Sequence, residues 1–219
     1  MFDRQIAYWG MEKQKLLENS SILVAGIGGL GCLLSEILVR AGVGRIYLCD
    51  DGEIDESDLN RQFLYYKEDV GEKKINIAIK RLAKIHSTTE IVSVNGKIDH
   101  DFIIPEDILG VVDCLDNYES RFALWDRLES GMFLVHSGVE RFFGQVLTLI
   151  KEKSPMLSDI FLNLDENTRP IPISADSAAV ISSIASVEVI KNIFRNPALV
   201  NTFLIIDLSD FTFNKIQVC

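Results

Sequence analysis

Apolar residues follow two different patterns along the first two thirds of the chain, short continuous runs and helical spacing. Five short apolar runs predict buried strands, at residues 21–25, 45–49, 90–95, 109–113 and 133–138. Helical spacing of apolar residues predicts helices at 12–19, 29–42, 72–86 and 118–130. In the first of these helices we expect Leu16 and Leu17 to face inward. Strands that alternate with helices through right-handed crossovers indicate a mostly parallel sheet.

The pattern changes after residue 150. A strand is expected at 145–150, a largely buried helix at 175–194, and an antiparallel hairpin from 203–207 and 211–217. The segment 151–173 is irregular and longer than compact domains usually carry without purpose. We therefore expect it to contact the substrate or to be locally disordered.

These elements predict a single α/β domain over residues 1–219. Residues 1–150 would form a Rossmann-like, doubly wound nucleotide-binding core, and 151–219 would add a crossover loop, a helix and antiparallel C-terminal strands. A hydrophobic share of 47% and a charged share of 25% suit such a domain with a full core.

The first predicted strand runs into a glycine-rich turn, Gly26-Ile-Gly28-Gly29-Leu-Gly31. Glycines let backbone N–H groups approach a phosphate, and the N-terminus of the following helix favours negative charge. Asp50 ends the next strand, where a carboxylate suits the two hydroxyl groups of a ribose. The pattern predicts a nucleotide site, and a tight turn without a ligand is the alternative.

Composition and charge limit which binding partners and which cellular compartment we expect. A net charge of −10 argues against binding along nucleic acid, which needs clustered Lys and Arg. The N-terminus lacks the features of a signal peptide, and no apolar run reaches the roughly 18–20 residues of a membrane span. The four cysteines form no CxxC pairs, and Cys32, Cys49 and Cys114 lie in apolar segments. We expect a cytoplasmic protein without disulfides.

Four polar clusters are hard to explain by packing. They are Phe2-Asp-Arg4-Gln5 before the first helix, Asn60-Arg61-Gln62, Lys73-Lys74, and Asp113-Cys-Leu-Asp116-Asn117. The last three would meet at the carboxyl edge of the sheet, near the glycine turn. Cations neutralise charge that develops on a transferred phosphate, and a carboxylate can hold Mg²⁺. The clusters therefore suit phosphoryl or nucleotidyl transfer.

Taken in this order, the motifs resemble the ubiquitin-activating-enzyme-like superfamily. This group includes the ThiF, MoeB and HesA adenylyltransferases and the adenylation domains of ubiquitin- and SUMO-activating enzymes. Gly138 and Gly144-Gln145 also match its SG…GQ pattern. The resemblance implies ATP-dependent adenylation of the C-terminal carboxylate of a small ubiquitin-like sulfur carrier of the ThiS or MoaD type, or of another protein or peptide.

The resemblance also implies roles for individual residues. Gly26, Gly28, Gly29 and Gly31 would face the phosphates of ATP, and Asp50 would hold the ribose. Asn60, Arg61, Gln62 and Lys74 would bind the nucleotide, Asp116 would bind Mg²⁺, and Asn117 would support its loop. Arg4 would reach across a homodimer interface into the partner's site. Arg4, Arg61, Lys74 and Asp116 are the candidate catalytic residues.

The sequence departs from the family pattern at several points. Gly52 replaces a second acid after the ribose aspartate, and Asp58 replaces the first asparagine of the family's N-L-x-R-Q. A carboxylate that faced the phosphates would weaken ATP binding unless Mg²⁺ or a lysine intervened. The paired CxxC motifs of a structural zinc are absent, so we expect no zinc. Residues 151–180 contain no cysteine, which favours adenylation followed by transfer to an external sulfur donor or amine.

Two other functions stay open at this point. An NAD-dependent oxidoreductase would use the same glycine turn, but it leaves the basic and acidic clusters unexplained. A non-catalytic scaffold paired with an active homologue is favoured by Gly52 and Asp58 and opposed by the retained cations.

Structural roles are also open for several residues. Asn117 could cap a helix, and Arg61 could pair with a neighbouring acid such as Asp58. The three histidines show no ligand spacing.

Overall fold

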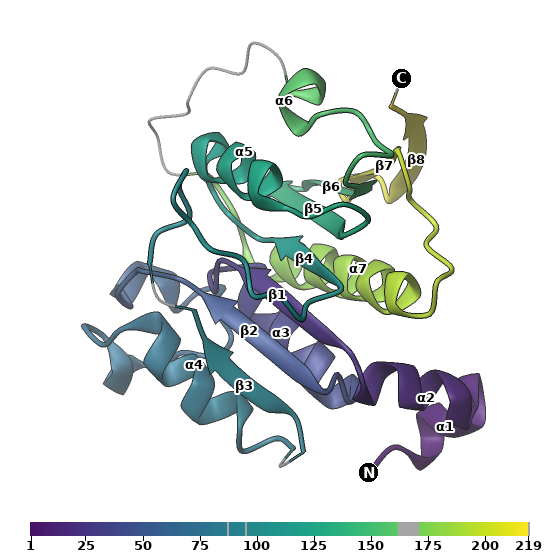
Figure 1. Cartoon of the computed structure of the whole chain (residues 1–219). Helices are drawn as coiled ribbons and strands as arrows, with labels where there is room; N and C mark the ends of the chain where they lie inside the picture. The colour runs from purple at the N-terminus through teal and green to yellow at the C-terminus, as the bar shows by residue number, and fades with distance from the viewer. Residues whose placement is uncertain (87, 95, 162–170, 219) are drawn as a thin grey trace.

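An eight-stranded sheet runs through the chain in the order β3-β2-β1-β4-β5-β6-β7-β8 (Figure 1). The structure, a computed structural model, describes residues 1–86, 88–94, 96–161 and 171–218. The strands are β1 (Ser21–Ala25), β2 (Arg45–Cys49), β3 (Glu90–Ser93), β4 (Gly110–Asp113), β5 (Phe133–Glu140), β6 (Phe143–Ile150), β7 (Thr202–Asp207) and β8 (Thr212–Gln217). Pairing is parallel from β3 to β5 and antiparallel from β5 to β8. The predicted α/β sheet with an antiparallel C-terminal extension is confirmed.

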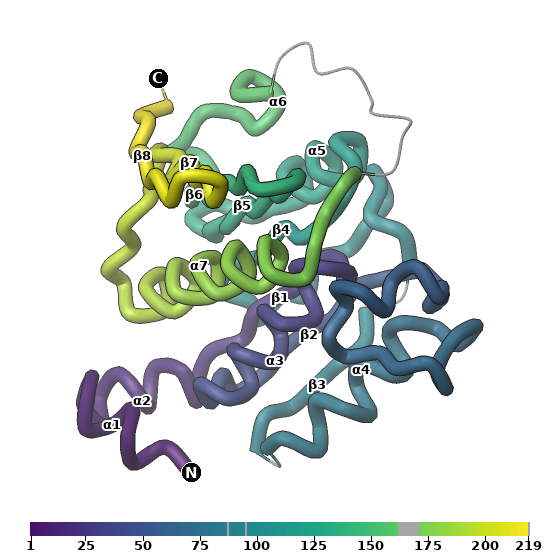
Figure 2. The backbone as a smooth tube through the Cα atoms, turned by 180° about the vertical axis from the view of Figure 1, so that it is seen from behind, coloured from purple at the N-terminus to yellow at the C-terminus, as the bar shows by residue number. Residues whose placement is uncertain are grey.

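Helices cover both faces of this sheet. They are α1 (Asp3–Trp9), α2 (Met11–Glu18), α3 (Gly31–Ala41), α4 (Lys74–Leu82), α5 (Tyr118–Arg127), α6 (Leu157–Ile160) and α7 (Ala175–Ile193), with 3₁₀ turns η1 (Glu56–Asp58) and η2 (Lys67–Asp69). Helices α3, α4 and α7 lie on one face, as the view from behind shows (Figure 2), and α5 lies on the other. Among the described residues no helix is both long and apolar enough to cross a membrane.

Strand β1 shows why the parallel strands are apolar at every position. Ile22 and Val24 pack into the cluster under α3 and α7, whereas Leu23 and Ala25 pack into the cluster under α5. Successive side chains of a strand point to opposite faces, so a strand covered by helices on both sides must be apolar throughout. All four side chains are fully buried.

The N-terminal segment differs from the prediction. Arg4 was expected ahead of the first helix, but it lies within α1 and is exposed. The side chain of Gln5 donates to Gln14 Oε1 (2.7 Å) and to the carbonyl of Ala41 (2.8 Å), which ties α1 and α2 to the end of α3. The inward orientation predicted for Leu16 is wrong, because this short helix buries a single stripe made of Gln14 and Leu17.

Some helix and strand boundaries also differ from the prediction. Helix α4 begins at Lys74 and ends at Leu82, so it is shorter at both ends than the predicted helix at 72–86. The C-terminal hairpin is confirmed by the antiparallel pairing of β7 with β8. The crossover segment contains α6, and its residues 162–170 lie outside the described part of the chain.

Candidate active site

A pocket of about 520 Å³ opens at the carboxyl ends of the parallel strands. Its wall combines the turn after β1, the segments that follow β2, β3 and β4, and the end of β5. Ile171 and Ile173 of the crossover segment complete it. The predicted site residues on this wall are Gly26, Gly28, Gly29, Asp50, Arg61, Gln62, Lys74, Asp116 and Asn117. Residues from distant parts of the sequence therefore meet where the sheet topology places a ligand.

The glycines of the turn have two different reasons for being glycine. Gly26 has φ +90°, and a Cβ there would lie 2.7 Å from the carbonyl oxygen of Cys114. A Cβ at Gly31 would lie 1.9 Å from the carbonyl oxygen of Gly26. At Gly28 and Gly29 the nearest heavy atoms would be 3.8 and 3.4 Å away, so the protein itself leaves room for a side chain. Glycine at these two positions keeps the floor of the pocket open, as close approach of a phosphate requires.

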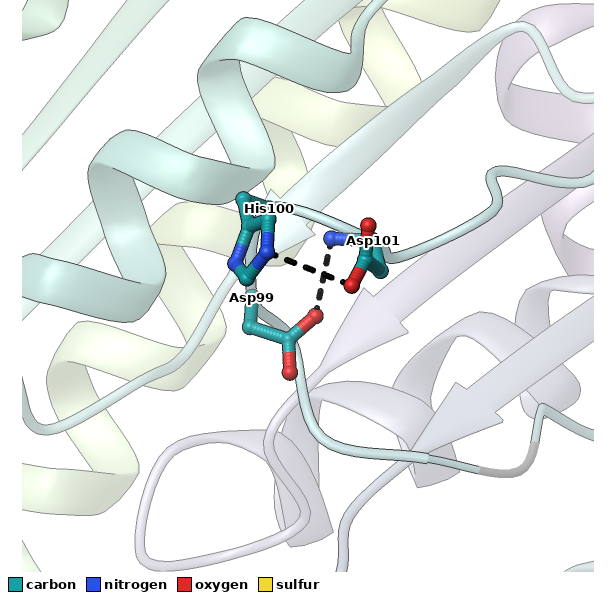
Figure 3. A group of neighbouring side chains, drawn as sticks. All are labelled: Asp99, His100 and Asp101. Atoms are coloured by element: carbon teal, nitrogen blue, oxygen red, sulfur yellow. Dashed lines mark hydrogen bonds and ion pairs between the residues drawn. The ribbon is translucent and has the colours of Figure 1, made fainter.

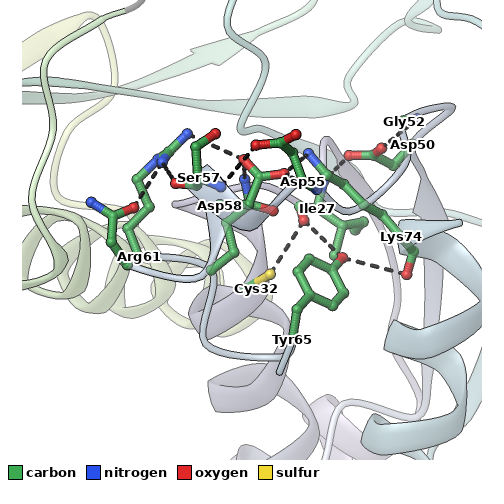
Figure 4. A network of polar contacts seen from close by, with 12 residues as sticks. Ile27, Cys32, Asp50, Gly52, Asp55, Ser57, Asp58, Arg61, Tyr65 and Lys74 are labelled. Atoms are coloured by element: carbon green, nitrogen blue, oxygen red, sulfur yellow. Dashed lines mark hydrogen bonds and ion pairs between the residues drawn. The ribbon is translucent and has the colours of Figure 1, made fainter. Parts of the chain in front are cut away.

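Asp50 is fixed by the backbone around it (Figure 4). Its Oδ2 accepts a hydrogen bond from the N–H of Ile27 (2.7 Å), and its Oδ1 accepts one from the N–H of Gly52 (2.9 Å). A carboxylate has about four acceptor sites, so both oxygens can still accept a hydroxyl donor. The arrangement suits a ribose.

Asp58 binds three of the predicted nucleotide-binding side chains at once (Figure 4 labels Asp58, Arg61 and Lys74). Its Oδ1 accepts from Gln62 Nε2 (2.6 Å) and lies 3.3 Å from Arg61 Nη2. Its Oδ2 lies 3.3 Å from Lys74 Nζ. Two cations thus compensate the carboxylate that was expected to repel phosphate.

The loop after β4 presents Asp116 to the pocket. Asn117 begins α5 as its N-cap, because its Oδ1 accepts from the N–H of Ser120 (2.8 Å). The Asn117 amide also donates to Asp116 Oδ1 (3.3 Å). Asp116 is exposed on the pocket wall, and a carboxylate oxygen is the type of ligand that Mg²⁺ prefers.

A buried network behind this loop was not predicted. Asp113 Oδ1 accepts from the N–H of Leu115 (3.0 Å), and Arg121 Nη2 donates to the carbonyl of Leu115. Asp113 Oδ2 accepts from His136 Nδ1 (2.7 Å). Both peptide groups of Leu115, the residue before Asp116, are therefore held. The sequence signal was a carboxylate that ends a buried strand and an arginine on the inner side of the next helix.

The charge states of this network follow from burial and from its cation. Burial works to raise the pKa of Asp113, but the charge of Arg121 and the hydrogen bond from His136 outweigh it and hold that pKa below its ordinary value. Burial, and then the charge of Arg121, lower the pKa of His136. A neutral ring with its proton on Nδ1 leaves Nε2 to accept from Gln145 Nε2, 3.1 Å away.

Three predicted site residues lie elsewhere. Gly31 packs beneath the turn, and Asn60 is exposed, with its Oδ1 accepting from Arg61 Nη1 (2.8 Å). Arg4 lies on α1, and Figure 1 shows this helix near the amino end of β1. The pocket lies at the carboxyl end of that strand. Within one chain the structure does not bring Arg4 to the pocket wall that it describes.

The described cysteines are unbonded and buried. Burial raises the pKa of Cys32, Cys49 and Cys114 to about 12 in each case, so none is a thiolate at neutral pH. Cys219 lies outside the described residues. None of the three described thiols is available as a nucleophile.

A second group of ligand-type side chains lies on the loop after β3 (Figure 3). His100 Nε2 is 3.2 Å from Asp101 Oδ2, and the N–H of Asp101 donates to Asp99 Oδ1 (3.0 Å). His100 and Asp101 are exposed, and these contacts run between neighbours in sequence. They are typical of a surface turn, and we assign no ion to them.

The chain matches the ThiF family over residues 2–219. It belongs to this family. A sulfur carrier protein adenylyltransferase of Thermus thermophilus is 30% identical over 226 residues, which cover 95% of this chain and 82% of that protein. A molybdopterin-synthase adenylyltransferase of Salmonella typhimurium is 32% identical over 204 residues, 87% of this chain and 80% of that protein. The predicted superfamily is confirmed.

Other relatives are longer than this ThiF-family chain. A probable molybdopterin-synthase adenylyltransferase of Porphyra purpurea is 30% identical, and the match covers 83% of this chain but 50% of that protein. Among solved structures, E. coli MccB with ATP has a TM-score of 0.84 at 20% identity, covering 99% of this chain and 71% of that one. At such identity the likeness is one of fold.

The two kinds of glycine predict different effects of substitution by alanine, one on stability and the other on ATP binding. Gly31→Ala should lower the free energy of unfolding by about 3 kcal/mol or more, because the new methyl group overlaps a backbone carbonyl. Gly29→Ala should change it by less than about 1 kcal/mol but weaken ATP binding at least about tenfold, because its methyl fills the pocket floor. Urea unfolding and calorimetry measure both. Wild-type ATP affinity in Gly29→Ala would show that phosphates do not lie on this floor.

The neutral state of His136 predicts a loss of stability in acid. The unfolded chain takes up a proton near the ordinary histidine pKa of about 6.5, whereas the folded chain resists until lower pH. Stability should therefore be full above about pH 6.5 and fall below it, with a further loss below about pH 4 from Asp113. His136→Asn, which keeps an N–H donor, should reduce the loss between pH 7 and 5 in urea unfolding, whereas exposed His100→Asn should not. Equal slopes in all three proteins contradict this assignment.

Proposed function

We propose that this chain is an ATP-dependent adenylyltransferase that activates the C-terminal carboxylate of a small ubiquitin-like sulfur carrier or of a peptide. The observation that carries the proposal is the convergence of the glycine turn, Asp50, Arg61, Lys74 and Asp116 on one pocket in a ThiF-family chain. Relatives matched along most of their length are named as adenylyltransferases of sulfur carriers and of molybdopterin synthase.

The pocket fits ATP on three counts. Its floor at Gly28 and Gly29 is open to phosphate, and its cations, Arg61 and Lys74, lie beside that floor. The buried Oε1 of Gln62 has no hydrogen-bond partner among the described residues, and native proteins rarely leave such an atom unsatisfied. As an acceptor it can bind a hydroxyl, an amine or a water, but not a phosphate oxygen. Bound Mg²⁺, held through Asp116, would neutralise charge on the phosphates.

The proposed reaction forms a mixed anhydride. A carboxylate oxygen of the partner bonds to the α-phosphorus of ATP, the bond from that phosphorus to the bridging oxygen breaks, and pyrophosphate leaves. Arg61 and Lys74 would counter the charge that develops on the phosphates, and Asp50 would fix the position of the nucleotide. With no thiolate among the described residues, we propose that the acyl-adenylate passes to an external sulfur donor or amine.

The antiparallel strands offer a surface for the body of the partner. The strand register places Phe143 and Ile216 on the same face of β6–β8, and each is 55% exposed. Gln145 lies on this face too, and it pairs with Gly138 of the pocket wall. Phe143 is level with Asp207 and Ile216 with Phe203, so the two exposed apolar side chains lie at opposite ends of this face, and a docked partner would cover both. We propose that the partner docks here and that its C-terminal tail enters the pocket past Gly138.

We propose further that the active form is a homodimer. Arg4 lies far from its own pocket, at the other end of β1, so it can act at a site of this type from a second copy. The other two functions are less well supported. Neither an oxidoreductase nor a scaffold accounts for cations and a carboxylate gathered on the pocket wall.

Exchange of pyrophosphate into ATP tests the reaction. With a small ubiquitin-like sulfur carrier as the partner, the wild type should catalyse exchange. Arg61→Ala or Asp116→Ala should reduce it at least about 100-fold, because each removes a charge at the reacting phosphates. Exposed Asp126→Ala and Arg127→Ala on α5 are matched controls and should retain exchange. Absence of exchange with every such partner favours the scaffold, and tight NAD binding with indifference to ATP and Mg²⁺ favours the oxidoreductase.

Mixing two inactive variants tests the dimer. When Arg4→Ala and Asp116→Ala chains are produced together, half of the sites in mixed dimers combine an intact Asp116 with an intact Arg4. About a quarter of the wild-type exchange rate should return, although each variant alone is inactive. A monomer in light scattering, or no recovery in proven mixed dimers, removes Arg4 from the site.

A further inference from the structure

We propose that Asp58 is an internal counter-ion that occupies the phosphate-binding side chains and thereby lowers the affinity of the site for ATP. The inference rests on the proposed function, because it concerns the same pocket. Arg61, Gln62 and Lys74 all bind this one carboxylate and all line the pocket. Asp58 therefore takes the place that an anionic ligand would take among them.

The position of Asp58 makes these interactions strong. Its side chain is 11% exposed, and those of Arg61 and Lys74 are 24% and 15% exposed. Charges that are shielded from water interact more strongly than charges on an open surface. One carboxylate between two cations halves the positive charge that the cluster offers to a phosphate.

Asp58 lowers the affinity for ATP whether it is displaced or stays in place when the nucleotide binds. If phosphate displaces Asp58, the contacts to both cations break, and a shielded carboxylate loses its counter-ions. If Asp58 stays, its negative charge lies beside the phosphates and repels them. The structure also holds Asp58 from behind, because Oδ2 accepts from the N–H of Asp55 (3.2 Å) and closes η1.

Asparagine at this position would separate charge from shape. An amide oxygen can still accept from Gln62 or from the backbone, but it brings no negative charge. Asp55 provides the matched control in the same loop. Its exposed carboxylate accepts from the N–H of Ser57 (2.8 Å), and it is not part of the pocket wall, so Asp55→Asn makes the same change in net charge.

Calorimetric titration with ATP in the presence of Mg²⁺ tests the inference. Asp58→Asn should bind ATP about tenfold more tightly than the wild type, and the gain should shrink at high salt. Asp55→Asn should stay within about twofold of the wild type, and adenosine, which carries no phosphate, should bind both variants like the wild type.

Thermal unfolding without nucleotide gives a second readout. Asp58→Asn should lower Tm more than Asp55→Asn does, because Arg61 and Lys74 then face each other without a counter-ion, and ATP should raise its Tm further than that of the wild type. If the wild type binds ATP and Asp58→Asn binds it equally or more weakly, the inference is overturned and the proposed function stands. If neither protein binds ATP, both fail.

Discussion

The close approach of the turn after β1 to the end of β4 is the contact on which the rest of the site depends. Two glycines allow it, because a side chain at Gly26 would strike the carbonyl of Cys114 and one at Gly31 would strike Gly26 itself. This contact places the start of α3 next to the loop that carries Asp116. The pocket is thus bounded on two sides by backbone that cannot separate without unpacking the sheet.

Ion pairs then set the positions of the loops around this rigid centre. Asp113, Arg121 and His136 hold the peptide groups before Asp116, and Asp58 holds the side chains of the loop after β2 and of α4. Groups that are held in place before the reaction need little rearrangement as charge develops. The same charges that fix the geometry also determine how much positive potential is left for a ligand.

The strands, the glycine turn and the residues at the carboxyl edge could be predicted, because each depends on local periodicity or on the general topology of parallel sheets. The contacts among shielded charged and polar side chains could not. Asp58 meets Lys74 because of the path taken by residues 51–71, and Asp113 meets His136 because β4 and β5 pair in one register. Helix α1 was missed because seven residues carry too little periodicity to be distinguished from a loop.

Strand β8 ends the sheet in the described part of the chain, and all six of its residues are exposed. A terminal strand presents one row of backbone donors and acceptors that can template another strand, which makes it a site of aggregation. Lys215 at its centre is the kind of charged gatekeeper that discourages such growth. A positive charge at this position opposes pairing of β8 with the same strand of a second copy.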